Sequence, residues 1–69
     1  MMKTNKEMGR LLFKLRKEKG LNKQELSELL GVSPVSIQFY ELGHRRPSDE
    51  VKVKYAIVFD KTVQELFYK

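Results

Sequence analysis

Apolar side chains recur three and four residues apart in separate stretches of this chain, which is the spacing of one face of an α-helix. The first stretch follows Thr4 and Glu7, whose spacing is that of a capping box at a helix N-terminus. We therefore expect a first helix that runs to about Lys19 and is closed by Gly20. Its apolar stripe consists of Met8, Leu11, Leu12 and Leu15.

A second helix is predicted to begin at about Lys23. Asn22 is a good N-cap, and Glu25 stands three residues later, where its side chain can bond back to the cap. Gly31 follows directly and can take the positive φ that a helix end requires. The expected apolar face of this helix is Leu26, Leu29 and Leu30.

A third helix signal comes immediately after that glycine. Ser33 is again an N-cap, and Pro34 stands at the first helical position, where its missing N–H and fixed φ are tolerated. Gly43 is expected to end this helix. With no room for a loop between the two helices, residues 22–42 are predicted to form a helix-turn-helix, packed through Val32, Ile37 and Tyr40.

Two more helices complete the prediction. Ser48 is the expected cap of the first, with Asp49 and Glu50 at its positive end, and Thr62 with Glu65 forms a capping box for the second. Their inward residues are predicted to be Val51, Tyr55, Val58 or Phe59, then Val63, Leu66 and Phe67. No β-alternation or repeat occurs, so the fold class is all-α: a compact five-helix bundle in one domain, residues 1–69, with 1–5 expected to be flexible.

The composition of the chain limits the classes of function that it can have. A chain of 69 residues with no cysteine has neither a disulfide framework nor a cysteine zinc site, and it is too small for a deep catalytic cleft. His44 is the only histidine, and no Ser-His-Asp set or phosphate-binding glycine loop occurs, so we expect no enzyme, no cofactor and no metal. No apolar run approaches membrane-spanning length, which predicts a cytoplasmic protein without a membrane partner. The formal charge of +5 favours an anionic partner.

From about Met8 to Phe67 the chain resembles the Cro/CI-type helix-turn-helix family, also called the XRE family, whose members include phage repressors. The matching residues are Gly9, Leu12, Leu15, Arg16, Leu26, Gly31, Val32, Ser33, Ile37, Glu41, Gly43, Pro47, Ser48, Ala56, Glu65 and Leu66. The resemblance implies a lambda repressor-like domain that binds double-stranded DNA sequence-specifically, with the second motif helix in the major groove. It implies a transcriptional regulator of bacterial or phage type, expected to be a repressor and a homodimer on DNA.

The resemblance also implies roles for individual residues. The base-facing set would be Pro34, Val35, Ser36, Gln38 and Phe39. Phosphate or minor-groove contacts would come from Lys23, Gln24, Ser33, Arg45 and Arg46. Arg16 and Glu41 match a structural salt bridge, and the dimer contacts would be Phe67 and Tyr68.

Several residues depart from the family pattern. Pro34, Val35 and Phe39 are apolar where base-reading side chains are expected, which favours contact with thymine methyl groups and an A·T-rich site. Leu11 and Phe13 occupy positions that are usually charged, and Asp60-Lys61 replaces a common glycine and apolar pair. An alternative is therefore a protein-binding helix-turn-helix module, antitoxin-like or an anti-repressor, that uses the apolar face around Val35 and Phe39.

Overall fold

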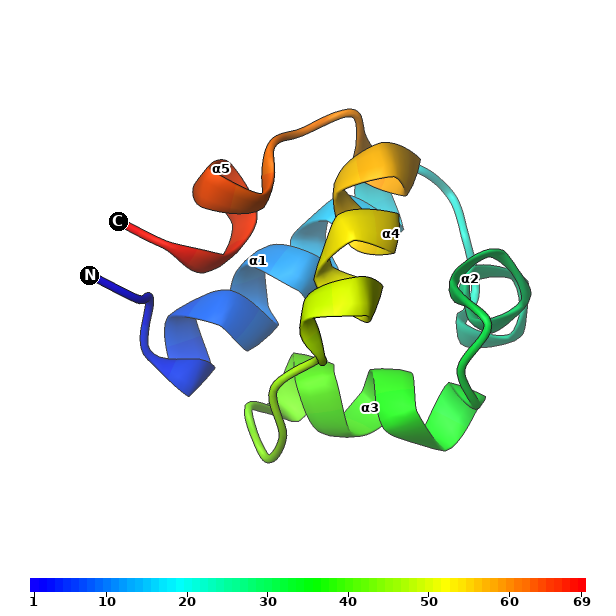
Figure 1. The fold of residues 1–69 in the computed structure, drawn as a ribbon. Coiled ribbons are helices and arrows are strands. Elements are labelled where there is room, and N and C mark those ends of the chain that lie inside the picture. Colours follow the sequence, from blue (N-terminus) through cyan, green and yellow to red (C-terminus); the bar gives the residue numbers. More distant parts are fainter.

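The computed structural model describes all 69 residues, and five α-helices make up its regular structure (Figure 1). They are α1 (Asn5–Glu18), α2 (Lys23–Leu30), α3 (Pro34–Leu42), α4 (Asp49–Phe59) and α5 (Val63–Phe67). In the view of Figure 1, α4 lies in front of α1 in the middle of the molecule, α2 and α5 lie on opposite sides, and α3 runs along one edge. The prediction of an all-α bundle of five helices is confirmed.

Each helix begins at the cap that the sequence predicts. The Thr4 hydroxyl accepts from the Glu7 N–H at 3.1 Å while the Glu7 carboxylate accepts from the Thr4 N–H at 2.8 Å. The same reciprocal pair joins Asn22 with Glu25 in α2, and Thr62 with Glu65 in α5. Because backbone N–H groups bond to their charged forms, the pKa values of Glu7 and Glu65 are lowered. Local capping therefore sets the start of these helices.

The turn after α4 is made without glycine. Asp60 adopts a left-handed conformation with φ 53° and ψ 47°, and the Lys61 N–H donates back to the Ala56 carbonyl at 3.0 Å. Aspartate tolerates this conformation better than most residues because its side chain is short and polar. The departure from the family's glycine thus leaves the turn in place.

The core lies between α4 and the four other helices, and Tyr55 is at its centre. The Tyr55 ring is fully buried and approaches the rings of Tyr40, Phe59 and Phe67 at centroid distances of 5.6–6.2 Å. Its hydroxyl has no hydrogen-bond partner, and burial raises its pKa. The remaining core is Met8, Leu12, Leu26, Leu30, Ile37, Ala56 and Leu66, with Leu11, Leu15, Val32, Val51 and Val63 packed against it.

Leu29 was expected on the apolar face of α2, and this prediction is wrong. Its side chain is 55% exposed, whereas Leu26 and Leu30 are fully buried. Ser27 shares their buried face, with its hydroxyl bonded to the Gln24 carbonyl at 2.7 Å. The small serine lets α2 pack through this side, so Leu29 falls at the margin of the contact.

The N-terminal segment, expected to be flexible, pairs with the other end of the chain. The Lys3 N–H donates to the Phe67 carbonyl at 2.9 Å, and the Lys69 N–H donates to the Met1 carbonyl at 2.7 Å. The two ends lie next to each other beside α5 (Figure 1). Backbone hydrogen bonds between residues far apart in the chain therefore hold this segment in the structure.

Two side chains near α5 are buried, and for Phe67 this contradicts a prediction. Phe67, predicted as a dimer contact, is fully buried against Tyr55 and is not available to a second copy. Lys52 is only 6% exposed, because its ammonium group lies over the rings of Phe67 and Tyr68 at 5.6 and 5.4 Å and 3.6 Å from Asp49. Leu66 and Phe67 are the two residues that α5 buries in the core.

Candidate nucleic-acid interface

The connection between α2 and α3 consists of three residues. Gly31 has φ 71°, and both its N–H and that of Val32 donate to the Ser27 carbonyl, at 2.8 and 3.2 Å. Ser33 then caps α3, its hydroxyl accepting from the Ser36 N–H at 3.1 Å. Residues 22–42 therefore form the predicted helix-turn-helix.

α3 is held from behind by a close approach to α1. A Cβ atom on Gly9 would overlap the Glu41 carbonyl oxygen and lie 2.9 Å from that of Tyr40. The backbones of the two helices thus touch at a position that only glycine fits. This contact fixes the C-terminal half of α3 on the bundle.

The predicted Arg16–Glu41 salt bridge is present and nearly buried. The Arg16 Nε and Nη2 atoms donate to the two Glu41 carboxylate oxygens at 2.7 and 3.1 Å, and Nη1 donates to the Leu21 carbonyl at 3.0 Å. The exposed fractions of the two side chains are 7% and 5%. The Glu41 carboxylate raises the pKa of the Arg16 guanidinium. This pair ties α1, the loop before α2, and α3 together.

The outer side of α3 is left uncovered by the rest of the molecule (Figure 1). Val35 is 60% exposed and Gln38 is exposed, while Pro34 and Phe39 are half-buried. The half-buried Ser36 is engaged at the start of the helix. Its hydroxyl oxygen accepts a hydrogen bond from the Ser33 hydroxyl at 3.1 Å. The structure thus brings the predicted base-facing residues together along one helix, with Ser36 committed to the cap.

Sequence reasoning missed Leu42, which continues the exposed row of α3 and is 56% exposed. Residues 35, 38, 39 and 42 follow the i, i+3, i+4, i+7 spacing of one helix face. This spacing is visible in the sequence and is the signal from which the exposure of Leu42 could have been predicted.

Three of the predicted phosphate contacts lie at the start of α2 or directly after α3. Lys23 and Gln24 begin α2, with Lys23 half-buried and Gln24 exposed. Arg45 is exposed after α3, and its guanidinium carbon lies 5.1 Å from the centre of the Phe39 ring. His44 also lies next to this ring, at 6.2 Å. Lys23 therefore lies near Gln38 and Leu42 of the exposed row, and Arg45 lies over Phe39.

Arg46, predicted to contact phosphate, points into the protein instead. Its Nη1 atom donates to the Asn5 side chain at 2.8 Å and to the Lys3 carbonyl at 3.1 Å. Its Nε and Nη2 atoms are buried without partners. We correct its role accordingly: Arg46 anchors the loop after α3 to the start of α1.

No three His, Cys, Asp or Glu side chains lie close enough together to hold a metal ion. None of the five helices has both the length and the apolar composition needed to cross a bilayer.

Comparison with known proteins gives consistent matches. The family model described as Helix-turn-helix matches residues 12–66. The HTH-type transcriptional regulator AnsR of Bacillus subtilis is 42% identical over 55 residues, which cover 80% of this chain and 47% of AnsR. This chain therefore spans about half the length of that relative.

Two solved structures have the same fold. The restriction-modification controller protein C.AhdI from Aeromonas hydrophila superimposes with a TM-score of 0.83 and 32% identity, covering 91% of this chain and 96% of C.AhdI. The clp gene regulator ClgR from Corynebacterium glutamicum gives a TM-score of 0.83 and 25% identity, covering 93% of this chain and 68% of ClgR. These matches confirm the predicted family and favour a DNA-binding regulator over the protein-binding alternative. The chain belongs to the Cro/CI-type (XRE) helix-turn-helix family.

Proposed function

We propose that this member of the Cro/CI-type family is the DNA-binding domain of a transcriptional regulator, residues 1–69 acting as one unit with α3 in the major groove. The observation that carries the proposal is the uncovered row on α3, with Lys23 near Gln38 and Leu42 and Arg45 over Phe39. An α-helix fits the major groove, and cations beside such a helix are suited to the phosphates that border the groove.

The base-facing residues are proposed to be Pro34, Val35, Gln38 and Phe39. Apolar side chains cannot make the bidentate hydrogen bonds that separate guanine from adenine, but they pack well against the thymine C5-methyl group. Gln38 is exposed on the same row and can bond to adenine N6 and N7. The preferred site is therefore A·T-rich.

The phosphate contacts are proposed to be Lys23, Gln24, Ser33 and Arg45. Lys23 and Gln24 present their side chains at the positive end of α2, where an anion is favoured. Arg45 is exposed, and stacking on Phe39 orients its guanidinium beside the reading face. Arg46 is left out of this set because its side chain bonds within the protein.

We further propose that two copies bind a pseudo-palindromic site with half-sites about 34 Å apart and thereby repress transcription in the cytoplasm. One α3 offers few base contacts, and a second copy doubles them. Of the two predicted dimer contacts only the half-buried Tyr68 is accessible, and Ile57 is the most exposed apolar side chain of α4, at 74%. Sedimentation that finds one protein per two-half-site duplex at saturation would contradict the dimer.

The decisive test is selection from random duplex DNA followed by a salt titration of the selected site. We expect A·T-rich sites and an affinity that falls steeply as salt rises, because phosphate contacts release counterions. Enrichment of G·C-rich sites would overturn the proposed contact of the apolar side chains with thymine methyl groups. Absence of binding at low salt would overturn the proposed function.

A further inference from the structure

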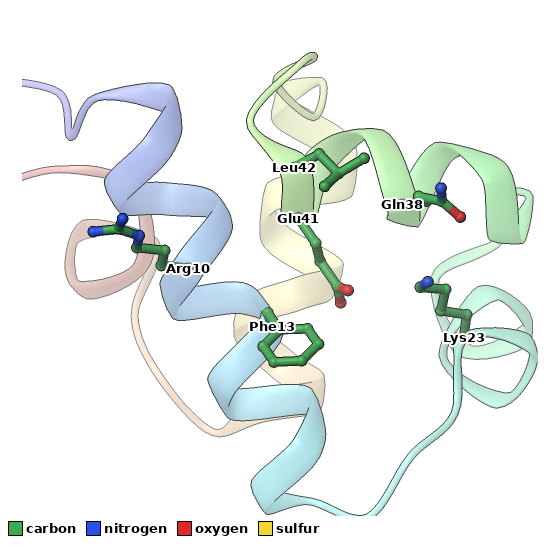
Figure 2. A pocket seen from close by; sticks show the side chains of 6 residues that line it. All are labelled: Arg10, Phe13, Lys23, Gln38, Glu41 and Leu42. Carbon is green, nitrogen blue, oxygen red and sulfur yellow. The ribbon is translucent and has the colours of Figure 1, made fainter.

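A hollow of about 290 Å³ opens between α1, α2 and α3. Figure 2 shows the six residues that line it: Arg10, Phe13, Lys23, Gln38, Glu41 and Leu42. Its volume is just below the roughly 300–1,000 Å³ typical of small-molecule sites. A ligand that fits it is therefore small, about one ring with a short side group.

Two large apolar side chains from different helices meet at this hollow. Phe13 on α1 is 47% exposed, and Leu42 on α3 is 56% exposed. Both lie within reach of one bound molecule, although each is the kind of side chain that folding normally covers. An apolar ligand body would remove both from water, which favours its binding.

The charges inside the hollow favour an anionic group on that ligand. In Figure 2 the side chains of Lys23 and Glu41 point into the hollow, while the Arg10 guanidinium points away from it. Both Glu41 oxygens accept from Arg16, at 2.7 and 3.1 Å, so its charge is neutralised. Lys23 takes part in none of the ion pairs of the structure. The free charge facing the ligand is thus the Lys23 ammonium.

We propose that the hollow binds a small organic acid with an aromatic or branched aliphatic body. The carboxylate pairs with the Lys23 ammonium, and the body packs on Phe13 and Leu42. Lys23 is also a proposed phosphate contact, so this regulatory role rests on the proposed function. The acid and the DNA backbone would compete for one ammonium group, and the acid would lower the affinity for DNA.

The site itself is tested without DNA, by titrating the full ¹⁵N-labelled chain with 3-phenylpropionate in NMR spectra. We expect shifts in the amide signals around Phe13, Lys23 and Leu42, and binding of the neutral 3-phenylpropionamide that is weaker by roughly tenfold, the value of one modest charge contact. Equal binding of the amide, or shifts confined to other parts of the chain, would overturn the proposal.

Three single substitutions test whether the ligand binds in this hollow. Phe13→Ser and Leu42→Ser each remove a half-exposed apolar side chain, and we expect each to weaken 3-phenylpropionate binding by roughly tenfold. Ile57→Ser removes an exposed apolar side chain outside the hollow and should leave binding unchanged. Circular dichroism checks that all three remain helical. Wild-type affinity in both hollow variants would overturn the proposal.

Competition is tested with a duplex of about 20 base pairs at low salt, two helical turns long. We expect 3-phenylpropionate to weaken DNA binding by the wild type more than the same concentrations of acetate or of the amide do. Phe13→Ser should bind DNA normally and lose this response. If the acid binds and DNA affinity does not change, the shared use of Lys23 is wrong. If the wild type does not bind DNA at all, the proposed function fails, while the NMR titration still decides whether the acid site exists.

Discussion

The two sides of the helix-turn-helix differ in how tightly the rest of the chain constrains them. On the inner side, Gly9 admits no Cβ against α3, and the Arg16–Glu41 pair is almost without exposed surface. On the outer side, Val35 and Leu42 are more than half exposed and contact no other helix closely enough to be covered. Substitutions on the inner side should therefore lower the free energy of unfolding, whereas those on the outer side should change only the binding of DNA.

The largest effect is expected when the buried ion pair is broken. Glu41→Leu leaves the Arg16 guanidinium buried without its carboxylate, which should lower the free energy of unfolding by about 3–5 kcal/mol. The double variant Arg16→Met, Glu41→Leu removes both charges and should recover most of that loss. Urea unfolding of both proteins measures the difference. An equally unstable double variant would show that packing rather than the unpaired charge explains the loss.

A matched pair on α2 compares the two sides within one helix. Leu30→Ala removes a fully buried side chain and should cost about 2–5 kcal/mol, because it leaves a cavity. Leu29→Ala removes its 55% exposed neighbour and should change stability by less than about 0.5 kcal/mol. Thermal unfolding followed by circular dichroism suffices. Similar losses for both would place Leu29 in the core after all.

The contact between α1 and α3 is tested at Gly9. Gly9→Ala adds a methyl group where backbone oxygens already stand, and it should cost about 1–3 kcal/mol through forced displacement of the helices. Gly20→Asn is the control, since nothing lies within 4 Å of its Cβ and asparagine tolerates its φ of 74°. If Gly9→Ala lowered the free energy of unfolding no more than Gly20→Asn does, α1 and α3 would be able to move apart without penalty.

The smallest effect on stability is expected on the outer side. Val35→Ser should leave the free energy of unfolding within about 0.5 kcal/mol of the wild type. It should nevertheless change base preference at one position of the site, which repeated selection from random DNA would reveal. A uniform loss of affinity for all sequences, with the preference unchanged, would contradict the base-facing role of Val35.

The local part of the fold was predictable because its causes are local. Capping boxes, the glycine after α2 and the proline at the start of α3 act within three or four residues. The local amino-acid sequence is therefore enough to place the helix ends. Even Asp60 fits this description, since its side chain tolerates the left-handed turn by itself. The Arg16–Glu41 pair, separated by 25 residues, was expected only from the family resemblance.

The sequence by itself determined five helices, a helix-turn-helix and the residues that can stand on the outer face of α3. Only the tertiary structure decided which of these side chains are free. Arg46 is anchored by Asn5, 41 residues away, Phe67 is covered by Tyr55, and Leu29 is left outside the packed face of α2. The hollow between Phe13 and Leu42 likewise exists only once α1 and α3 are packed together. The reason is that helical periodicity fixes which residues share a face, whereas burial depends on what distant segments place against that face.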